Sequence, residues 1–354
     1  MHHFIFPTAD TWISSGSSTI DGESFKDQNF GQDEILELKK EFYNKAFHHQ
    51  TRLLINFEGN DLTELSKSIH NGNIGRPTLT QENISGSRFF LRLYEAEGNK
   101  ELSTEYTLKA YPLFQSWDEG RGKFEDNPKV TNGCSWENRS YPDNGNAISW
   151  SNVDGTQHHG GYYISQSGEA SQSFSYQSPD VEMEITPIVA NWFNGTNTNY
   201  GLLLKVSGSH ETDETTFGNL KFFSRNTHTI YSPRLEVRWD DHLPCTGSNT
   251  GSLNELTMSG LADNYISMPG LRDSYKQTER VKFRIKPRDR YIQKTFSRSV
   301  QTLTGSFIPE GKGFYSIKDV TTDETIVPFS TYTSMSCDTK GNYFIQWLDG
   351  FYPD

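Results

Sequence analysis

One stretch of sequence decides the fold: Thr51-Arg52-Leu53-Leu54-Ile55-Asn56-Phe57. Its nearly continuous run of apolar residues is typical of a central strand. Far along the chain, Asn199-Tyr200-Gly201-Leu202-Leu203-Leu204 leads into a second run of this kind. We expect these distant segments to belong to the first and last parts of one β-sandwich.

Strand signals dominate the first 242 residues. Ile35-Leu36-Glu37-Leu38-Lys39 alternates apolar and polar side chains, which is the period of a half-buried strand. Further strands are predicted at residues 88–94, 106–111, 173–176, 181–185, 220–225 and 234–239. The expected fold class is therefore all-β, with a jelly-roll-like β-sandwich over residues 1–242.

Two short helices are predicted within this sandwich. Residues 62–69 place their apolar side chains on one stripe. Residues 186–193 begin with Thr186 as the expected N-cap and Pro187 at the first helical position. Gly195 is well placed to end this helix in the left-handed conformation.

The segment at about residues 112–172 is a loop-rich excursion. It is crowded with Gly, Asn, Asp and Ser, yet it contains Trp117, Trp136 and Trp150. Composition alone predicts a loop, whereas three tryptophans indicate that the loop is packed down. We expect an ordered excursion across one face of the sandwich.

A linker and irregular segment is predicted at residues 243–278, followed by a smaller β-domain at residues 279–354. Strand patterns recur there at intervals of roughly 10 residues, which is typical of an immunoglobulin-like sandwich. They lie at residues 281–286, 300–307, 315–319, 325–329 and 343–347. Such a sandwich would have one more strand beyond Asp354. Either the natural chain continues, or a neighbouring chain supplies the strand.

Composition argues against several classes of partner. The formal net charge is −12, and no long basic block is present. Binding to nucleic acid relies on clustered Lys and Arg, so no nucleic-acid partner is expected. No apolar run approaches the roughly 20 residues that span a bilayer, so no membrane insertion is expected.

Three widely separated cysteines, Cys134, Cys245 and Cys337, show no metal-ligand spacing. We expect three unpaired thiols, as in a protein assembled in a reducing cytoplasm. The start of the sequence lacks the basic and apolar regions of a signal peptide.

Residues 4–240 resemble the DNRLRE family, which is related to carbohydrate-binding modules. The matches are the Ala9-Asp10-Thr11 strand, the Asn29-Phe30-Gly31 turn, a core strand that begins at Arg52, and several later motifs. The residues that carry the resemblance are Asp10, Asn29, Gly31, Arg52, Trp192, Gly195, Tyr200, Gly201, Ser224, Arg225, Pro233 and Arg234. For these residues we favour structural roles.

Physical chemistry suggests what some of these residues do. Asn29 and Gly31 suit a turn with positive φ. Arg52 and Arg225 can hold carboxylates or carbonyls through forked hydrogen bonds. Asp10 can accept backbone donors or bind calcium beside other oxygens.

Most of residues 180–354 resemble virion proteins of marine, T4-like bacteriophages. The similar segments are 232–241, 281–285, 291–297, 319–329 and 336–344. The resemblance implies a virion protein that is assembled in the cytoplasm of a host bacterium. In that group a further strand usually follows the position of Pro353.

No pattern of catalytic residues emerges. The chain has no serine nucleophile elbow and no phosphate-binding glycine loop. The acidic pairs Asp118-Glu119 and Glu125-Asp126 lie in a segment where chance pairs are expected. Paired histidines at residues 48–49 and 158–159 are poor chelates, since neighbours on a strand point to opposite faces. We therefore expect no enzyme activity, no cofactor and no metal.

Aromatic residues of the excursion are the candidates for binding. They are Trp117, Trp136, Tyr141, Trp150, Tyr162 and Tyr163. These rings can stack on glycans, or they can fasten the loop to the sandwich or to another subunit, which we favour.

The expected function is a non-enzymatic structural component of a tailed phage virion, located in the tail, neck, baseplate or head. Its partners would be other virion proteins and copies of itself. The alternative is an adhesion module that binds host glycans.

Overall fold

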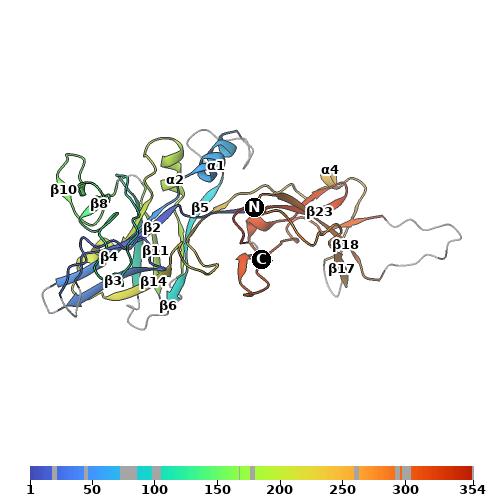
Figure 1. Cartoon of the computed structure of the whole chain (residues 1–354). Helices are drawn as coiled ribbons and strands as arrows, with labels where there is room; N and C mark the ends of the chain where they lie inside the picture. The colour runs from blue at the N-terminus through green and yellow to red at the C-terminus, as the bar shows by residue number, and fades with distance from the viewer. Residues whose placement is uncertain are drawn as a thin grey trace.

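Strands dominate the computed structural model of this chain, which confirms the all-β prediction. The structure describes residues 1–17, 22–43, 47–71, 86–97, 105–166, 168–175, 180–258, 263–291, 296 and 304–352. Two lobes follow one another along an elongated molecule, and both ends of the chain lie where the lobes meet (Figure 1). Tyr176 and residues 300–303, which were predicted to lie in strands, fall outside the described residues.

The first lobe contains a large antiparallel sheet. Its strands run in the order β11 (Ala170–Ser175), β7 (Glu105–Pro112), β13 (Leu202–Val206), β4 (Phe47–Asn56), β3 (Ile35–Tyr43), β14 (Gly218–Phe223) and β6 (Glu95–Glu97), and β2 (Ala9–Ser14) also pairs with β4. Within β4, Leu53, Leu54 and Ile55 pair directly with β13. The two distant apolar runs, which were predicted to belong to one β-sandwich, are neighbouring strands of one sheet.

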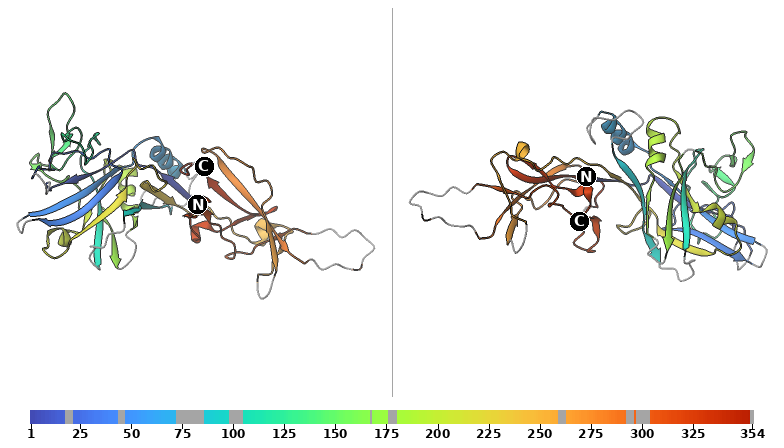
Figure 2. Two further views of the ribbon diagram at one scale, coloured as in Figure 1. Left: turned by 60° about the horizontal axis from the view of Figure 1, so that its bottom comes forward. Right: turned by 180° about the vertical axis from the view of Figure 1, so that it is seen from behind.

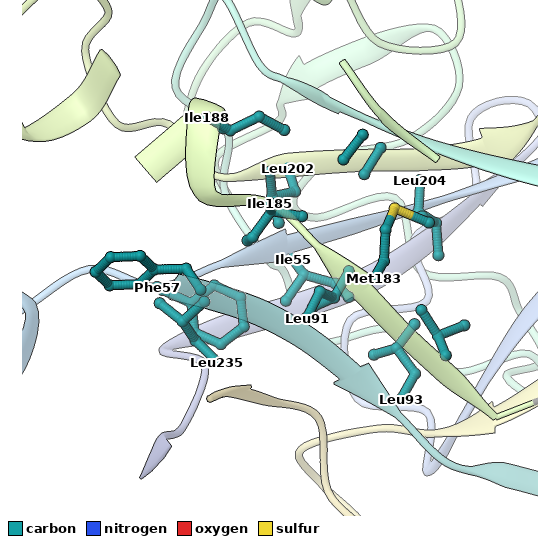
Figure 3. Close-up of a cluster of buried hydrophobic side chains, with 14 of the residues drawn as sticks. Ile55, Phe57, Leu91, Leu93, Met183, Ile185, Ile188, Leu202, Leu204 and Leu235 are labelled. Atoms are coloured by element: carbon teal, nitrogen blue, oxygen red, sulfur yellow. The ribbon is translucent and has the colours of Figure 1, made fainter. Parts of the chain in front are cut away.

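A four-stranded sheet packs on one face of the large sheet. Its order is β1 (His2–Ile5), β15 (Arg234–Arg238), β5 (Arg88–Leu93) and β12 (Val181–Glu184). Alternate residues of both sheets fill the core between them. Figure 3 shows Leu91 and Met183 from the smaller sheet together with Ile55 and Leu204 from the larger one, and all four are at most 1% exposed.

The two predicted helices are present. Helix α1 (Asn60–His70) buries Leu62, Leu65 and Ile69. Helix α2 (Thr186–Phe193) has Pro187 in its first turn, and Gly195 follows it with φ of 76°. The assignment of Thr186 as N-cap is wrong, because its hydroxyl accepts a hydrogen bond from the amide of Phe89 on β5 instead. None of the described helices is both long enough and apolar enough to cross a bilayer.

The remaining elements of the first lobe are small. Helix α3 (Gly208–Thr212) follows β13. The excursion contains a sheet of β8 (Asn138–Ser140), β9 (Ile148–Ser151) and β10 (Gln157–His158). Figure 1 shows this sheet beside the large sheet.

The second lobe is built around one four-stranded antiparallel sheet (Figure 2). Its order is β17 (Asn264–Ser267), β18 (Arg280–Asp289), β23 (Gly341–Trp347) and β22 (Ser336–Asp338). Two ribbons accompany it: β16 (Asn254–Glu255) with β19 (Ser306–Phe307), and β20 (Ile317–Lys318) with β21 (Thr325–Val327). Helix α4 (Gly247–Thr250) and the 3-10 turn η1 (Thr331–Thr333) complete the lobe.

The expectation of three unpaired thiols is wrong. Cys245 and Cys337 form a disulfide, with their Cα atoms 4.9 Å apart, and Cys134 is free and buried. Sequence spacing could not reveal this bond, since its cysteines are 92 residues apart and meet only when β22 lies beside α4. Unpaired thiols therefore cannot be used to infer assembly in a reducing cytoplasm.

Strand β1 joins the two lobes. It pairs with β15, and its Ile5 belongs to the core of the first lobe. Its Phe4 instead enters an apolar cluster of the second lobe, with its ring centroid 5.6 Å from that of Phe351. The amide of Gln346 on β23 donates a hydrogen bond to the carbonyl of His2 at 2.8 Å. One strand is thus shared by the cores of both lobes.

We expect Phe4→Ala to lower the free energy of unfolding by about 3 kcal/mol, because it removes a buried aromatic ring from the junction. Differential scanning calorimetry should then resolve two transitions, where the unaltered chain shows one. Phe296→Ala is the matched control, since the ring of Phe296 is fully exposed. A single unshifted transition for Phe4→Ala would contradict the shared core.

Candidate functional site

The outer face of the large sheet carries a second apolar core. Strands β2, β4 and β13 contribute Ile13, Leu54 and Leu203 to this face, while the residues next to them point into the sandwich. The excursion covers these side chains with Leu113, Cys134 and Trp150, all of which are fully buried. Continuous apolar runs in these strands are explained by burial on both faces.

The tryptophans predicted for binding contact the chain itself. The indole of Trp150 donates a hydrogen bond to the carbonyl of Ser135 at 2.9 Å. The indole of Trp117 donates to the carbonyl of Tyr200, also at 2.9 Å. The ring of Trp136 lies 5.0 Å from the guanidinium carbon of Arg52. The contacts of Trp117 and Trp136 fasten the excursion to the segment before β13 and to β4, whereas that of Trp150 holds two parts of the excursion together.

The predicted tyrosines differ in their contacts. Tyr163 packs on the ring of Tyr111, with centroids 4.5 Å apart. Tyr162 makes edge contacts with Phe114 and His158. Tyr141 is half-buried, and its carbonyl accepts a hydrogen bond from the amide of Gly133. Contact of these six rings with a glycan or another subunit stays a prediction.

Arg52 is the centre of a buried charged cluster under the excursion. Its Nε donates to Oε1 of Glu211 at 2.9 Å, and its Nη1 donates to the carbonyl of Gly160 at 2.5 Å. Lys205 pairs with the other carboxylate oxygen of Glu211 and donates to the hydroxyl of Tyr163 at 3.3 Å. Burial acts to raise the pKa of Glu211, but Arg52 and Lys205 hold it below its usual value.

Asn29 uses its side chain to tie the excursion to the turn before β3. Its amide donates to the carbonyls of Glu119 and Cys134 at 2.7 and 2.8 Å. Its carbonyl oxygen accepts from the amides of Gly31 and Gly122. All the hydrogen-bonding groups of this side chain are thus satisfied. From the sequence, Asn29 was expected only to form a turn.

The expectation of positive φ at this turn is wrong. Neither Asn29 nor Gly31 has positive φ. Gly31 is required for a different reason, because a Cβ atom there would overlap the carbonyl oxygen of Glu119. Close approach of the excursion, rather than a left-handed backbone, explains the glycine.

Arg225 forms the predicted forked contact with a carboxylate. Its Nε and Nη2 donate to the two carboxylate oxygens of Glu119, both at 2.6 Å. Its backbone amide donates to Oδ2 of Asp10 at 2.7 Å, so Asp10 accepts a backbone donor as expected. Oδ1 of Asp10 is buried and has no hydrogen-bond partner among the described residues. Burial raises the pKa of Asp10 to about 7, and the charge of Glu119 adds to the effect.

The other residues of the DNRLRE resemblance hold the backbone or the core. Gly201 has φ of 89°, and a Cβ atom there would press on the carbonyl of Ile55. The hydroxyl of Ser224 donates to the carbonyl of Asp33 at 2.6 Å. The indole ring of Trp192 lies in the sandwich core, and Pro233 is buried.

The guanidinium of Arg234 lies among aromatic rings at the junction of the lobes. Its carbon is 5.0 Å from the ring centroid of Tyr94 and 5.4 Å from that of Phe4. Its Nη2 donates to the carbonyl of Ile230 at 2.5 Å. Arg234 therefore supports the junction through both stacking and hydrogen bonding.

Sequence reasoning missed a buried charge cluster beside the junction. Glu236 is completely buried and accepts from Arg92 at 2.9 Å and from Arg238 at 3.0 Å, with Nδ1 of His2 at 2.5 Å. Burial acts to raise the pKa of Glu236, but these three partners hold it below its usual range. The signal in the sequence was the row of charged residues at alternate positions of the closing strand, Arg234, Glu236 and Arg238.

Several of the histidines and acidic residues weighed in the sequence lie within the described ranges. No group of three or more His, Cys, Asp or Glu in that part of the chain could hold a metal ion. His49 is buried, and the side chain of His48 lies outside the described residues. Glu119, one of the acidic residues weighed for hydrolysis, is engaged by Arg225.

Comparison with known proteins adds no relative: the chain matches no protein-family model and no curated protein.

We expect Arg52→Met to lower the free energy of unfolding by about 3 kcal/mol, since it removes one partner from a buried ion pair. Urea denaturation would measure the loss. Arg121→Met is the matched control, because Arg121 and Asp143 form an ion pair at the surface. Their side chains are 65% and 50% exposed. The control should change stability by less than about 1 kcal/mol. Equal losses in the two variants would contradict a buried cluster.

Asp10→Asn should stabilise the protein at pH 8 and have little effect near pH 4. The folded-state pKa of about 7 lies above the ordinary value of 3.8, so folding favours the protonated form and stability falls as pH rises through 7. Thermal unfolding of both proteins across this range would measure the difference. Asp154→Asn is the control, because hydrogen bonds from Thr156 lower the pKa of that exposed carboxyl. A difference for Asp10→Asn that does not depend on pH would refute the assignment.

Proposed function

We propose that this chain is a non-enzymatic structural component of a tailed bacteriophage virion. It would act in the tail, neck, baseplate or head, with other virion proteins and further copies of itself as partners. The resemblance of residues 180–354 to phage virion proteins supports this proposal. The observation that carries it is the shared strand β1, which makes one body of two β lobes.

A fixed junction suits a building block better than a mobile module. Linked domains move relative to one another by default unless their interface is large and apolar. Here Phe4 is inserted in the second lobe, and Trp347 of the second lobe packs against the core of the first. The rings of Trp239 and Trp347 lie 6.4 Å apart across the junction. Such a body can transmit a defined geometry from one contact to the next.

The alternative, an adhesin that binds host glycans, receives less support. Stacking on a sugar needs an exposed ring face. Trp150 is fully buried, and Trp117, Trp136 and Tyr163 are half-buried against their own lobe. These rings already have a structural role in fastening the excursion.

The disulfide is compatible with a particle that is assembled in the cytoplasm and released by lysis. Disulfides form and persist in oxidising surroundings, which the particle meets after release. Cys245 and Cys337 would stay reduced until then.

Mass spectrometry of purified virions from the infected host should detect this chain at a stoichiometry above one copy per particle. Purified protein should give no signal on a glycan array, and Trp136→Ala should leave that result unchanged. Absence from virions would refute the structural proposal. Glycan binding that Trp136→Ala abolishes, with Phe296→Ala as the control, would favour adhesion.

A further inference from the structure

Strand β18 has a basic residue at every second position. The series is Arg280, Lys282, Arg284, Lys286 and Arg288, and it continues to Arg290 beyond the strand. Alternate residues of a strand point to one face at a spacing of about 7 Å. The residues between them include Val281, Ile285 and Pro287, all of which are buried. The side of the sheet opposite these buried residues therefore carries a row of cations, which we call the basic face.

Only part of this charge is neutralised within the chain. Asp338 on β22 accepts hydrogen bonds from Lys282 at 3.1 Å and from Arg284 at 2.5 and 2.9 Å. Arg290 lies 3.4 Å from Asp263, and both of these side chains are exposed. Lys286 and Arg288 lie between these two groups of ion pairs.

Lys286, Arg288 and Lys340 have no ion-pair partner in the part of the chain that the structure describes. All three are exposed and line a groove of about 580 Å³. Glu255 and Asp289 also line this groove, so its cations outnumber its carboxylates by one. An exposed row of cations of this kind favours an acidic partner.

The surroundings of the basic face favour a protein as that partner. Tyr265 and Ile266 on the neighbouring strand β17 are 47% and 56% exposed, and Arg288 lies 4.8 Å from the ring centroid of Tyr265. Tyrosine and arginine are enriched at protein interfaces. The ring of Tyr343 is covered by Lys282 at 3.6 Å, which leaves that face of the ring closed to bases and sugars.

The chain itself has the complementary charge. Residues 1–242 contain 20 Lys and Arg against 33 Asp and Glu, whereas residues 243–354 contain 13 against 12. The acidic character of the protein therefore lies almost wholly in the first lobe. A second copy of this chain is therefore an acidic protein, and it is present wherever the first copy is.

One groove of about 370 Å³ on the first lobe has the charge opposite to that of the basic face. Lys123 is the cation among the described lining residues, and Lys39, outside the lining, pairs with Glu37 at 3.2 Å. Four carboxylates line this acidic groove. They are Asp33, Glu34, Glu37 and Glu125. Phe124, at its rim, is 47% exposed and offers apolar surface and a ring for an incoming guanidinium.

We propose that the basic face of one copy docks on the acidic groove of a second copy. The basic face belongs to the second lobe and the acidic groove to the first, and the two lobes lie at opposite ends of the molecule (Figure 2). Their pairing therefore joins copies head to tail. A contact between two different surfaces closes into a ring or grows into a filament. The contact deepens the assembly function proposed above, and it rests on that function.

Sedimentation velocity of the full chain tests the contact. We expect oligomers at about 50 mM salt and association that is roughly tenfold weaker at about 500 mM, because exposed charges are screened. Lys286→Glu with Arg288→Glu, and separately Glu34→Lys with Glu125→Lys, should each weaken self-association at least about tenfold. A mixture of these two double variants should associate again, since one partner keeps an intact basic face and the other an intact acidic groove.

Lys67→Glu with Lys312→Glu is the control for net charge, since both lysines are exposed and lie on neither surface. This variant should associate like the unaltered chain. A monomeric chain at low salt, or no recovery in the mixture, would overturn the contact. Binding of dextran sulfate or a single-stranded oligonucleotide by a monomeric chain, lost in the Lys286/Arg288 variant, would reassign the face to an anionic polymer. A chain that is monomeric but present in virions would overturn only this contact and leave the proposed function standing.

Discussion

The fold depends on the burial of strand β4 on both of its faces. Leu53 and Ile55 point into the sandwich, and Leu54 between them points to the opposite side of the sheet. An exposed row of such residues along β2, β4 and β13 would leave a large apolar patch in water. The excursion covers that patch, and its tryptophans supply much of the apolar surface that packs against it. A central strand that is apolar on both faces therefore requires the aromatic excursion as its cover.

The same logic extends to the ends of the first lobe. Strand β1 completes the smaller sheet with Ile5 and places Phe4 in the second lobe, so alternation along one short strand links two cores. The fully buried Glu236, held by Arg92, Arg238 and His2, adds a polar contact whose disruption would leave a buried charge. Apolar burial provides the cohesion of the junction, and the ionic cluster fixes its geometry.

Local patterns predicted the strands well and the contacts between distant segments poorly. Residues 88–94 were predicted as a strand and match the observed bounds of β5 (Arg88–Leu93) to within one residue, because apolar periodicity is a local signal. Thr186 and Gly31 were assigned from local rules, yet their roles come from Phe89 and Glu119, which are far away in the chain. The disulfide between Cys245 and Cys337 was missed for the same reason. Four aromatic residues of the excursion pack against the sheet, and their partners were not found from the sequence because they lie on distant segments. They are Trp117, Trp136, Trp150 and Tyr163.

The basic face shows how an average can hide a pattern. A search for a contiguous basic block fails because the cations of β18 alternate with buried residues such as Val281 and Ile285. A net charge of −12 then conceals the uneven distribution between the two lobes. Counting charge at a period of two, strand by strand, would have found the row from the sequence alone.

Electron cryomicroscopy of the intact particle tests the central claim most directly. The account predicts repeated copies of this chain as rigid two-lobed bodies, with the excursion packed on its own sheet and β18 facing the groove at Phe124 of the next copy. Particles without this chain, or copies whose lobes adopt several relative orientations, would contradict it.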